Sequence, residues 1–379
     1  MRAPTRMDVS LIGRWWWSID HASLFVLVAL ATIGIVVGFA AGPVASARLG
    51  IENSFHFPMR QLMFLGPAFL VIICVSMLTP LQARRLGAVT FAVALVTIIA
   101  LLAVGPEING AKRWAPLGAF GFQPSELLKP GFVIVAAWML AEGARNPKFP
   151  GAVIAMALYF ISAGLLVMQP DYGQAALLTM VWSAMFFIAG CPMIWVAAVF
   201  CAAAGVFWGA YYWSPHVARR IDAFLNPADG GNYQVEKAME AIANSGLGMK
   251  LDDAGAVKFS LPDAHTDFVF AVAAEEFGVL FCLLIIGLIG TFVVRALQRA
   301  MSLRSVFTQL AVCGLAAMIG LQSMINIAVN LRLMPAKGMT LPLISYGGSS
   351  LIATGLTIGL LLALTRRSEH AARRLDVMP

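Results

Sequence analysis

Residues 151–213 read GAVIAMALYFISAGLLVMQPDYGQAALLTMVWSAMFFIAGCPMIWVAAVFCAAAGVFWGAYYW, and this stretch decides the fold. It contains three apolar runs, at 151–168, 172–189 and 192–213. A helix of about 20 apolar residues is long enough to cross the ~30 Å hydrocarbon layer of a membrane. The breaks between the runs are so short that consecutive helices must turn back on one another as antiparallel hairpins.

Runs of the same kind occupy the rest of the chain. The sequence has 379 residues, of which 60% are hydrophobic and only 12% are charged, a composition typical of a membrane protein with many spans. The first run is too long for the apolar core of a signal peptide, so we expect it to remain as a span. We predict an all-α fold with about ten transmembrane helices, at 20–43, 60–79, 86–104, 124–142, 151–168, 172–189, 192–213, 266–294, 305–331 and 346–365.

The distribution of Lys and Arg predicts the orientation. Basic residues recur at the ends of alternate runs, which places both termini in the cytoplasm under the positive-inside rule. The net charge of +7 then reflects cytoplasmic loops and anionic lipids, and we expect no nucleic-acid partner. None of the five cysteines forms a CxxC pair, so the sequence predicts neither a zinc site nor a disulfide framework.

We expect one integral-membrane domain over residues 1–379 and no appended enzymatic domain. Residues 1–19 and 366–379 are its predicted cytoplasmic tails. A large extracytoplasmic loop, 214–264, connects the seventh and eighth helices and contains a short amphipathic helix near 233–244. The loops at 105–123 and 332–345 fall on the same outer side.

A group of charged residues lies where the eighth helix is expected to begin, in LPDAHTDFVFAVAAEE at 261–276. Each charge costs roughly 2.5–3.5 kcal/mol at the centre of a membrane helix, so such a group indicates function. Asp267 is expected in the first turn of this helix, where a carboxylate can simply cap the helix. Its neighbours Asp263 and His265, with Glu275 two turns further on, favour a second interpretation, a general base between water and a lipid-phase reactant.

A second group lies between residues 112 and 130. Arg113 and Lys129 could bind a phosphate or pyrophosphate, and Trp114 could stack on a sugar or an acyl chain. Arg113 and Trp114 could instead simply anchor the chain at the membrane interface. Lys129 could instead form an internally neutralised i, i+3 pair with Glu126.

Two further segments could contribute polar groups. Asp171 lies in a tight turn, where it either bonds its own backbone or faces a cavity. The segment 335–350, PAKGMTLPLISYGGSS, opens the last helix with Ser345, Gly347 and Ser349, and its free amides could hold an anion. Close helix packing explains such a segment equally well.

Five segments of the chain stand out together: NGAKRW at 109–114, QPSELLKP at 123–130, QPDYGQ at 169–174, LPDAHTDFVFAVAAEEFG at 261–278 and PAKGMTLPLISYGGSS at 335–350. In this order and spacing they resemble the SEDS family (shape, elongation, division and sporulation). The resemblance covers nearly the whole chain, and the sequence of the last segment is closer to the division members than to the elongation members. Asp263 replaces the Glu that is commoner in the family, and the loop before it departs from the family pattern.

The resemblance implies a peptidoglycan glycosyltransferase that polymerises lipid II at the outer face of the bacterial cytoplasmic membrane, at the division septum. It implies that Asp267 is the catalytic carboxylate and that Trp114, Glu126, Lys129 and Asp171 surround a central cavity. His265 is expected to orient Asp267. A cognate class B penicillin-binding protein and other septal division proteins are the implied partners.

Other functions stay open on the sequence alone. Buried charges such as Glu126 and Lys129 also mark transport pathways, so a lipid II flippase is one alternative. A scaffold without catalysis for the division machinery is another. Whether a divalent cation, Mg²⁺ or Mn²⁺, assists the reaction is left open by the residues and by the resemblance.

Overall fold

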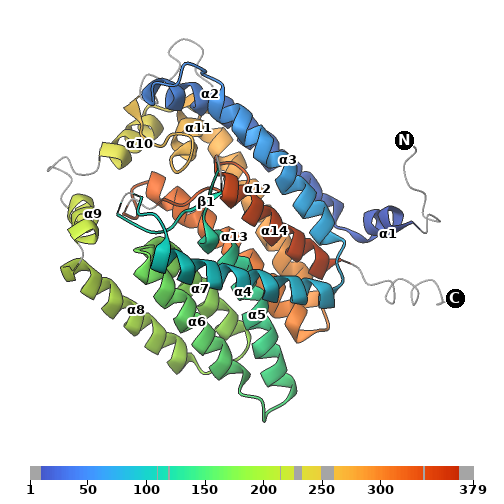
Figure 1. Ribbon diagram of the computed structural model, residues 1–379. Helices are drawn as coiled ribbons and strands as arrows, with labels where there is room; N and C mark the ends of the chain where they lie inside the picture. Colours follow the sequence, from blue (N-terminus) through green and yellow to red (C-terminus); the bar gives the residue numbers. More distant parts are fainter. Residues whose placement is uncertain are drawn as a thin grey trace.

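The computed structural model describes residues 10–108, 110–117, 120–213, 215–225, 233–248, 260–335 and 338–366, and it is a bundle of long helices (Figure 1). Nine helices of this described part are long and apolar enough to cross a membrane. They are α2 (His21–Arg48), α3 (His56–Ser76), α4 (Pro80–Val104), α5 (Pro124–Arg145), α6 (Gly151–Met168), α8 (Met193–Trp213), α12 (Val279–Ser302), α13 (Val306–Asn330) and α14 (Gly348–Thr365).

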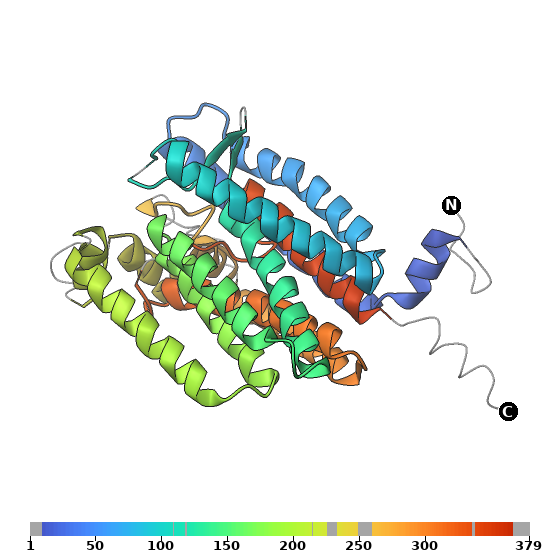
Figure 2. The ribbon, with the colours of Figure 1, turned by 60° about the horizontal axis from the view of Figure 1, so that its bottom comes forward.

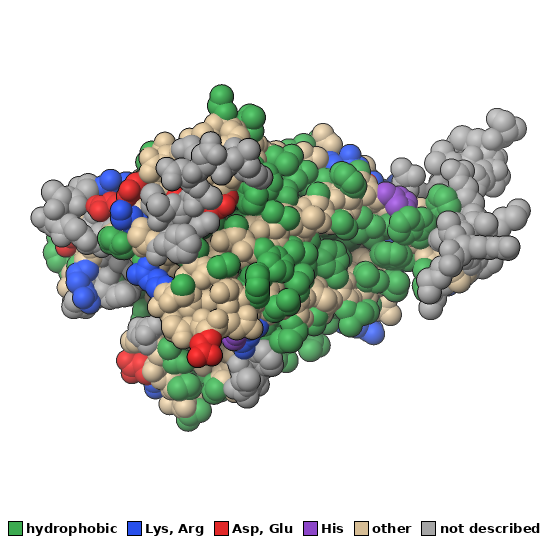
Figure 3. All heavy atoms as spheres, turned by 90° about the horizontal axis from the view of Figure 1, so that it is seen from above, with side chains coloured by type: hydrophobic (Ala, Val, Ile, Leu, Met, Phe, Trp, Pro, Cys, Tyr) green, Lys and Arg blue, Asp and Glu red, His purple; other side chains and the backbone are tan. Residues whose placement is uncertain are grey.

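The apolar α7 (Tyr172–Ile188) has 17 residues and occupies the sixth expected span, 172–189. Shorter helices complete the described part: α1 (Leu11–Ser18), α9 (Pro215–Leu225), α10 (Tyr233–Ala243) and α11 (Val269–Phe277). The polytopic α-helical fold predicted from the apolar runs is therefore confirmed. Hydrophobic side chains dominate the middle of the face seen in Figure 3, and acidic side chains gather at the end away from α1.

Helix α14 forms the centre of the bundle. It is the most buried of the nine spans, and 83% of its 18-residue apolar stretch is buried inside the protein. It packs along α3. A Cβ on Gly355 would lie 2.7 Å from the carbonyl oxygen of Ala68, so only glycine permits this approach of the two backbones. Small residues at such contacts allow membrane helices to pack closely.

An ion-pair cluster ties the ends of α2 and α12 together. Asp20, which is buried, lies 2.9 Å from an Arg295 nitrogen and 3.0 Å from an Arg299 nitrogen, and it accepts a hydrogen bond from Ser23. Burial alone would raise the pKa of Asp20, but the Ser23 hydroxyl and the two guanidinium groups lower it below the ordinary value. Helix α1 and the last turn of α14 lie at this same end of the bundle (Figures 1 and 2).

The expected eighth span, 266–294, is not one helix. It divides into α11 and α12 at Gly278, whose φ of 84° is accessible mainly to glycine. A Cβ there would also lie 2.7 Å from the Cα of Gly248, and the Val279 N–H bonds the carbonyl of Gly246 at 3.0 Å. The loop before the span therefore pairs with its backbone and interrupts the helix.

The loops contain structure of their own. In the 105–123 loop, β1 (Ala115–Leu117) and β2 (Phe120–Phe122) form a small antiparallel hairpin that the sequence did not predict. In the 214–264 loop, α10 confirms the amphipathic helix and buries Val235, Ala238 and Ala241 against α11 and α13. The remainder of that loop lies outside the described residues except for α9, 244–248 and 260–264.

Candidate functional site

Asp267 lies in a tight turn that ends before α11, which corrects the expectation that it occupies the first turn of a span. The backbone N–H groups of Thr266, Asp267 and Phe268 all lie 3.0–3.3 Å from the carbonyl oxygen of Asp263. Asp263 has a φ of 52°, a conformation that Asp and Asn adopt more readily than most residues. The turn leaves Asp267 half-buried and Asp263 exposed.

Two asparagines of α13 fix the backbone at Asp267. The side-chain amides of Asn326 and Asn330 donate to the Asp267 carbonyl oxygen at 2.9 and 3.0 Å. Asn326 also donates to the carbonyl of Met339 at 2.6 Å, and Asn330 accepts the N–H of Ala271 at 3.2 Å. Both asparagines are buried, so α13 links the turn, the start of α11 and the loop before α14.

The loop before α14 packs against the same turn. A Cβ on Gly338 would lie 3.3 Å from Oδ2 of Asp267, so this loop backbone passes directly beside the carboxylate. The N–H of Tyr346 donates to the carbonyl of His265 at 2.9 Å. Two segments singled out from the sequence, 261–278 and 335–350, thus form one unit around Asp267.

His265 is held by aromatic rings. Its ring lies 4.2 Å from that of Phe57 and 5.5 Å from that of Tyr346, between ring centroids. Its Nδ1 is buried and has no hydrogen-bond partner in the described part of the chain. Burial lowers the pKa of His265 to about 4, although the nearby Asp263 acts in the opposite direction. The imidazole is therefore neutral at ordinary pH.

A buried chain of polar side chains runs through the bundle from α7 to the loop before α14. Gln174 donates to Glu126 at 2.7 Å, and Glu126 pairs with Lys129 at 3.0 Å. Lys129 then donates to Gln322 at 3.0 Å, and Gln322 donates to the carbonyl of Thr340 at 2.9 Å. The i, i+3 pair anticipated from the sequence forms, and both charges are compensated inside the protein.

Arg113 and Asp171 meet at the turn between α6 and α7. Arg113 donates from Nε to the carbonyl of Gln169 at 2.8 Å and also bonds the carbonyl of Pro170, while its Nη1 lies 4.0 Å from Asp171. Gln123 donates to the Asp171 carboxylate at 3.2 Å. Burial raises the pKa of Asp171, and Arg113 opposes this only in part. Arg113 therefore anchors the 105–123 loop to this turn.

Trp114 supports the β-hairpin while keeping part of its ring accessible. A Cβ on Gly121 would lie 3.1 Å from the Trp114 ring, so the indole covers the strand opposite. Its side chain is nevertheless exposed. A face for stacking on a ligand is available.

The serines that precede α14 have mainly structural contacts. The Ser345 hydroxyl accepts the N–H of Leu341 at 2.8 Å and closes a turn. Gly347 stands at the N-cap of α14 without a side-chain cap, and Ser349 is buried in the first turn. Ser345 thus shapes the loop, and the backbone at Gly347 is the part of this segment best suited to an anion.

The sequence analysis missed Gln322, Asn326 and Asn330. They are spaced by four residues, so they lie on one face of α13 and line the site with amides. Three such polar residues in a membrane-spanning helix are themselves a signal of buried hydrogen bonding.

The metal-ligating side chains of the described residues are dispersed. No three His, Cys, Asp or Glu side chains of the described residues lie close enough together to hold an ion. The side chains that hydrogen-bond the Asp267 carbonyl are the amides of Asn326 and Asn330. These residues do not form a metal site by themselves.

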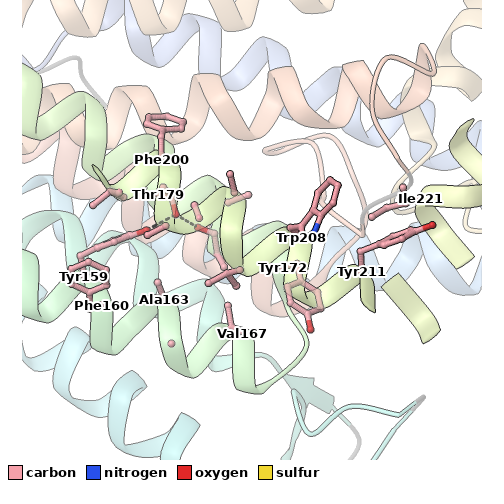
Figure 4. Close-up of a pocket in the computed structure, with 18 residues that line it drawn as sticks. Tyr159, Phe160, Ala163, Val167, Tyr172, Thr179, Phe200, Trp208, Tyr211 and Ile221 are labelled. Atoms are coloured by element: carbon pink, nitrogen blue, oxygen red, sulfur yellow. Dashed lines mark hydrogen bonds between the residues drawn. The ribbon is translucent and has the colours of Figure 1, made fainter. Parts of the chain in front are cut away.

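A large apolar cavity of about 900 Å³ lies between α6, α7 and α8 (Figure 4). Thr179 makes two hydrogen bonds there: one with the Tyr159 hydroxyl at 2.8 Å and one to the carbonyl of Ala175 at 2.8 Å. Tyr172, which directly follows Asp171, lines one part of it. The cavity therefore reaches the turn at which Arg113 and Asp171 meet. Aromatic side chains on its wall include Phe160, Phe200, Trp208 and Tyr211.

Comparisons with known proteins agree with this architecture. "Probable peptidoglycan glycosyltransferase FtsW" of Caulobacter vibrioides is 41% identical over 366 residues, which are 97% of this chain and 94% of that protein. The solved rod shape determining protein RodA of Thermus thermophilus has a TM-score of 0.69 and 28% identity, over 92% of this chain and 97% of that one.

A second solved structure is closer in shape. It is described as "Structural coordination of polymerization and crosslinking by a peptidoglycan synthase complex", with a TM-score of 0.75 and 29% identity over 92% of this chain and 98% of that one. The family model FtsW/RodA/SpoVE, described as "Cell cycle protein", matches residues 21–370. The chain belongs to this family of multi-pass membrane proteins.

Proposed function

We propose that this chain is a peptidoglycan glycosyltransferase that polymerises lipid II, with Asp267 as the general base. The Caulobacter relative bears the name of such an enzyme. The observation that carries the proposal is the placement of Asp267. Two asparagines fix its backbone, and its half-buried carboxylate lies beside the loop that precedes α14.

The reaction needs one proton acceptor. The 4-hydroxyl oxygen of the acceptor sugar attacks the anomeric carbon of the donor, and Asp267 takes the hydroxyl proton. The bond between that carbon and the pyrophosphate oxygen breaks, and undecaprenyl pyrophosphate leaves with the electron pair. A general base contributes typically ~10²–10⁴-fold to such a step, and no covalent nucleophile is required.

The two predicted phosphate ligands differ in how available they are. The Arg113 side chain is 28% exposed. Two backbone carbonyls hold its Nε and Nη2, but its Nη1 makes only a loose ion pair and can also contact a pyrophosphate. Lys129 is 2% exposed, and Glu126 and Gln322 occupy two of its three donors. We assign Arg113 to the leaving group and Lys129 to holding α5 against α13. Trp114, next to Arg113, is then the residue that meets a sugar ring.

The apolar cavity supports lateral binding of a lipid substrate. It lies between α6, α7 and α8, and Tyr172 connects it to the Asp171 turn. A prenyl chain could occupy this cavity while the pyrophosphate lies near Arg113. The substrate would then reach the site without leaving the membrane.

One observation favours transport as a second candidate. The chain Gln174–Glu126–Lys129–Gln322 is buried in the bundle, and buried ionisable groups also mark substrate pathways. All its charges are compensated internally, which suits a structural network better than a moving headgroup. We therefore rank the flippase second, and a scaffold without catalysis third.

Location and partners complete the proposal. We place the enzyme at the division septum with a class B penicillin-binding protein as its transpeptidase partner. The solved neighbour described as a peptidoglycan synthase complex supports a partner of this kind.

The test uses the full chain with its partner, fluorescent lipid II, and two readouts. Glycan strands are separated on gels, and headgroup movement is followed in sealed vesicles. The proposal predicts strands from the wild type and their loss in Asp267→Asn. Movement of lipid II without any strand formation by the wild type would instead establish the flippase.

A further inference from the structure

A second cavity, of about 430 Å³, lies at the end of the bundle where α4 and α13 begin and α5 ends. It is remote from the Asp267 site, because the first turns of α5 carry the Glu126–Lys129 pair that connects to Gln322 of α13, whereas the last turn of α5, at Arg145, lines this cavity. Its wall combines charged, aromatic and apolar groups, among them Arg84, Trp138, Glu142, Arg145, Ser305 and Phe307.

The charged side chains that line this cavity form no ion pairs with one another. The Arg84 guanidinium stacks 4.7 Å from the centroid of the Trp138 ring, which fixes its position. The ion pairs found among the described residues include none of Arg84, Glu142 and Arg145. Two guanidinium groups and one carboxylate are thus available to a ligand.

The start of α13 adds donors to the same wall. Ser305 is the N-cap of this 25-residue helix, and it makes no side-chain capping bond. Backbone N–H groups of an uncapped first turn, together with the helix dipole, favour an anion. Ser305, Val306 and Phe307 all line the cavity. Arginine and helix N–H groups therefore converge on one space.

We propose that this cavity binds the headgroup of a phospholipid. Arg84, Arg145 and the first turn of α13 hold the phosphate. Glu142 accepts the ammonium group of an ethanolamine headgroup, so phosphatidylethanolamine is preferred to phosphatidylglycerol. The acyl chains lie along the rim, where Leu81 is 48% and Val306 is 44% exposed.

The apolar rim is the reason to favour a lipid over free phosphate. The cavity lies at the ends of three spanning helices, at the depth expected of headgroups. Trp138 is half-buried beside the cavity, and tryptophan is enriched at that depth. Basic pockets between spans are a known way of binding lipid headgroups.

The test is native mass spectrometry of the delipidated full-length protein, titrated separately with four probes. The probes are phosphatidylethanolamine, phosphatidylglycerol, diacylglycerol and inorganic phosphate. The double variant Arg84→Gln/Arg145→Gln is compared with Arg85→Gln/Lys148→Gln, which removes the same charge from exposed neighbours that do not line the cavity. Size-exclusion elution and melting temperature verify that every variant is folded.

We expect one tightly held phosphatidylethanolamine, weakened by about tenfold or more in the cavity variant and unchanged in the control variant. Glu142→Gln should abolish the preference for ethanolamine while leaving phosphatidylglycerol binding intact. Three results would overturn the proposal: equal affinity of the two double variants, diacylglycerol binding as tight as that of the phospholipids, or phosphate binding as tight as lipid binding.

Discussion

At the scale of single residues, Asp267 depends on side chains that lie far from it in the sequence. Asn326 and Asn330 hold its carbonyl oxygen, and Gly338 leaves room beside its carboxylate. A general base must be held within hydrogen-bond reach of the proton that it removes. These amides are therefore positioning residues in the proposed mechanism.

Replacing Asn326 tests that role. Asn326→Ala removes the bonds to the carbonyls of Asp267 and Met339. Asn330 still donates to the Asp267 carbonyl, but the Met339 carbonyl loses its Asn326 donor, and leaving a buried acceptor unsatisfied costs about 1–3 kcal/mol. We expect the polymerisation rate to fall by about tenfold at saturating lipid II, with KM little changed, because a small displacement of the base lowers the rate of the chemical step.

The control is Ser323→Ala on the same helix. The Ser323 hydroxyl is buried but bonds only the carbonyl of Ile319, one turn earlier in α13. Its loss should leave the rate within about twofold of the wild type, since no contact with the site is removed. Equal effects of the two substitutions on rate would show that Asn326 has no special role in placing Asp267.

His265 gives a second prediction at this scale, on pH. Burial lowers its pKa to about 4 from the ordinary 6.5. Between these values the unfolded chain binds a proton that the folded chain does not, so unfolding becomes easier as the pH falls. The contribution to stability is complete above pH 6.5 and is lost towards pH 4.

The variant His265→Phe keeps an aromatic ring against Phe57 and Tyr346 but cannot titrate. Melting temperatures should be measured from about pH 7.5 to about pH 4.5. The wild type should lose more stability than the variant across this range. Parallel curves would mean that His265 does not titrate below its ordinary pKa.

At the scale of elements, the break between α11 and α12 is the feature that the sequence pattern concealed. The run 266–294 is apolar enough for a single span, so periodicity gave no reason to divide it. Gly278 divides it because its positive φ and the close backbone of Gly248 both require the absence of a side chain. Contact with a distant loop therefore determines where the helix ends.

A substitution at this break has a predictable cost. Gly278→Ala forces a Cβ to within 2.7 Å of Gly248 at a φ of 84°, and such strain costs about 1–3 kcal/mol. We expect a lower melting temperature and slower polymerisation, because α11 follows the Asp267 turn directly. Gly290→Ala, in α12 where a Cβ meets open space, should be neutral or stabilising. Equal melting temperatures of the two variants would contradict this interpretation.

At the scale of the whole molecule, the sequence predicted the bundle well and the site only in part. Apolar runs and short breaks are local properties, and they place the spans, except that they do not reveal the break at Gly278. The 261–278 and 335–350 segments were recognised individually, but their meeting at Asp267 depends on packing that periodicity does not encode. The amides of α13 and the β-hairpin were missed because each is satisfied by partners distant in the sequence or in a loop.

The measurement that tests the central claim most directly compares two isosteric changes in one turn. Asp267→Asn removes the proposed base, whereas Asp263→Asn removes an exposed carboxylate and keeps a residue suited to the φ of 52°. Initial rates of lipid II polymerisation are measured for both, with the partner present. We predict a loss of ~10²–10⁴-fold for Asp267→Asn and less than about twofold for Asp263→Asn. A near-normal rate for Asp267→Asn would contradict the assignment of Asp267 as the base.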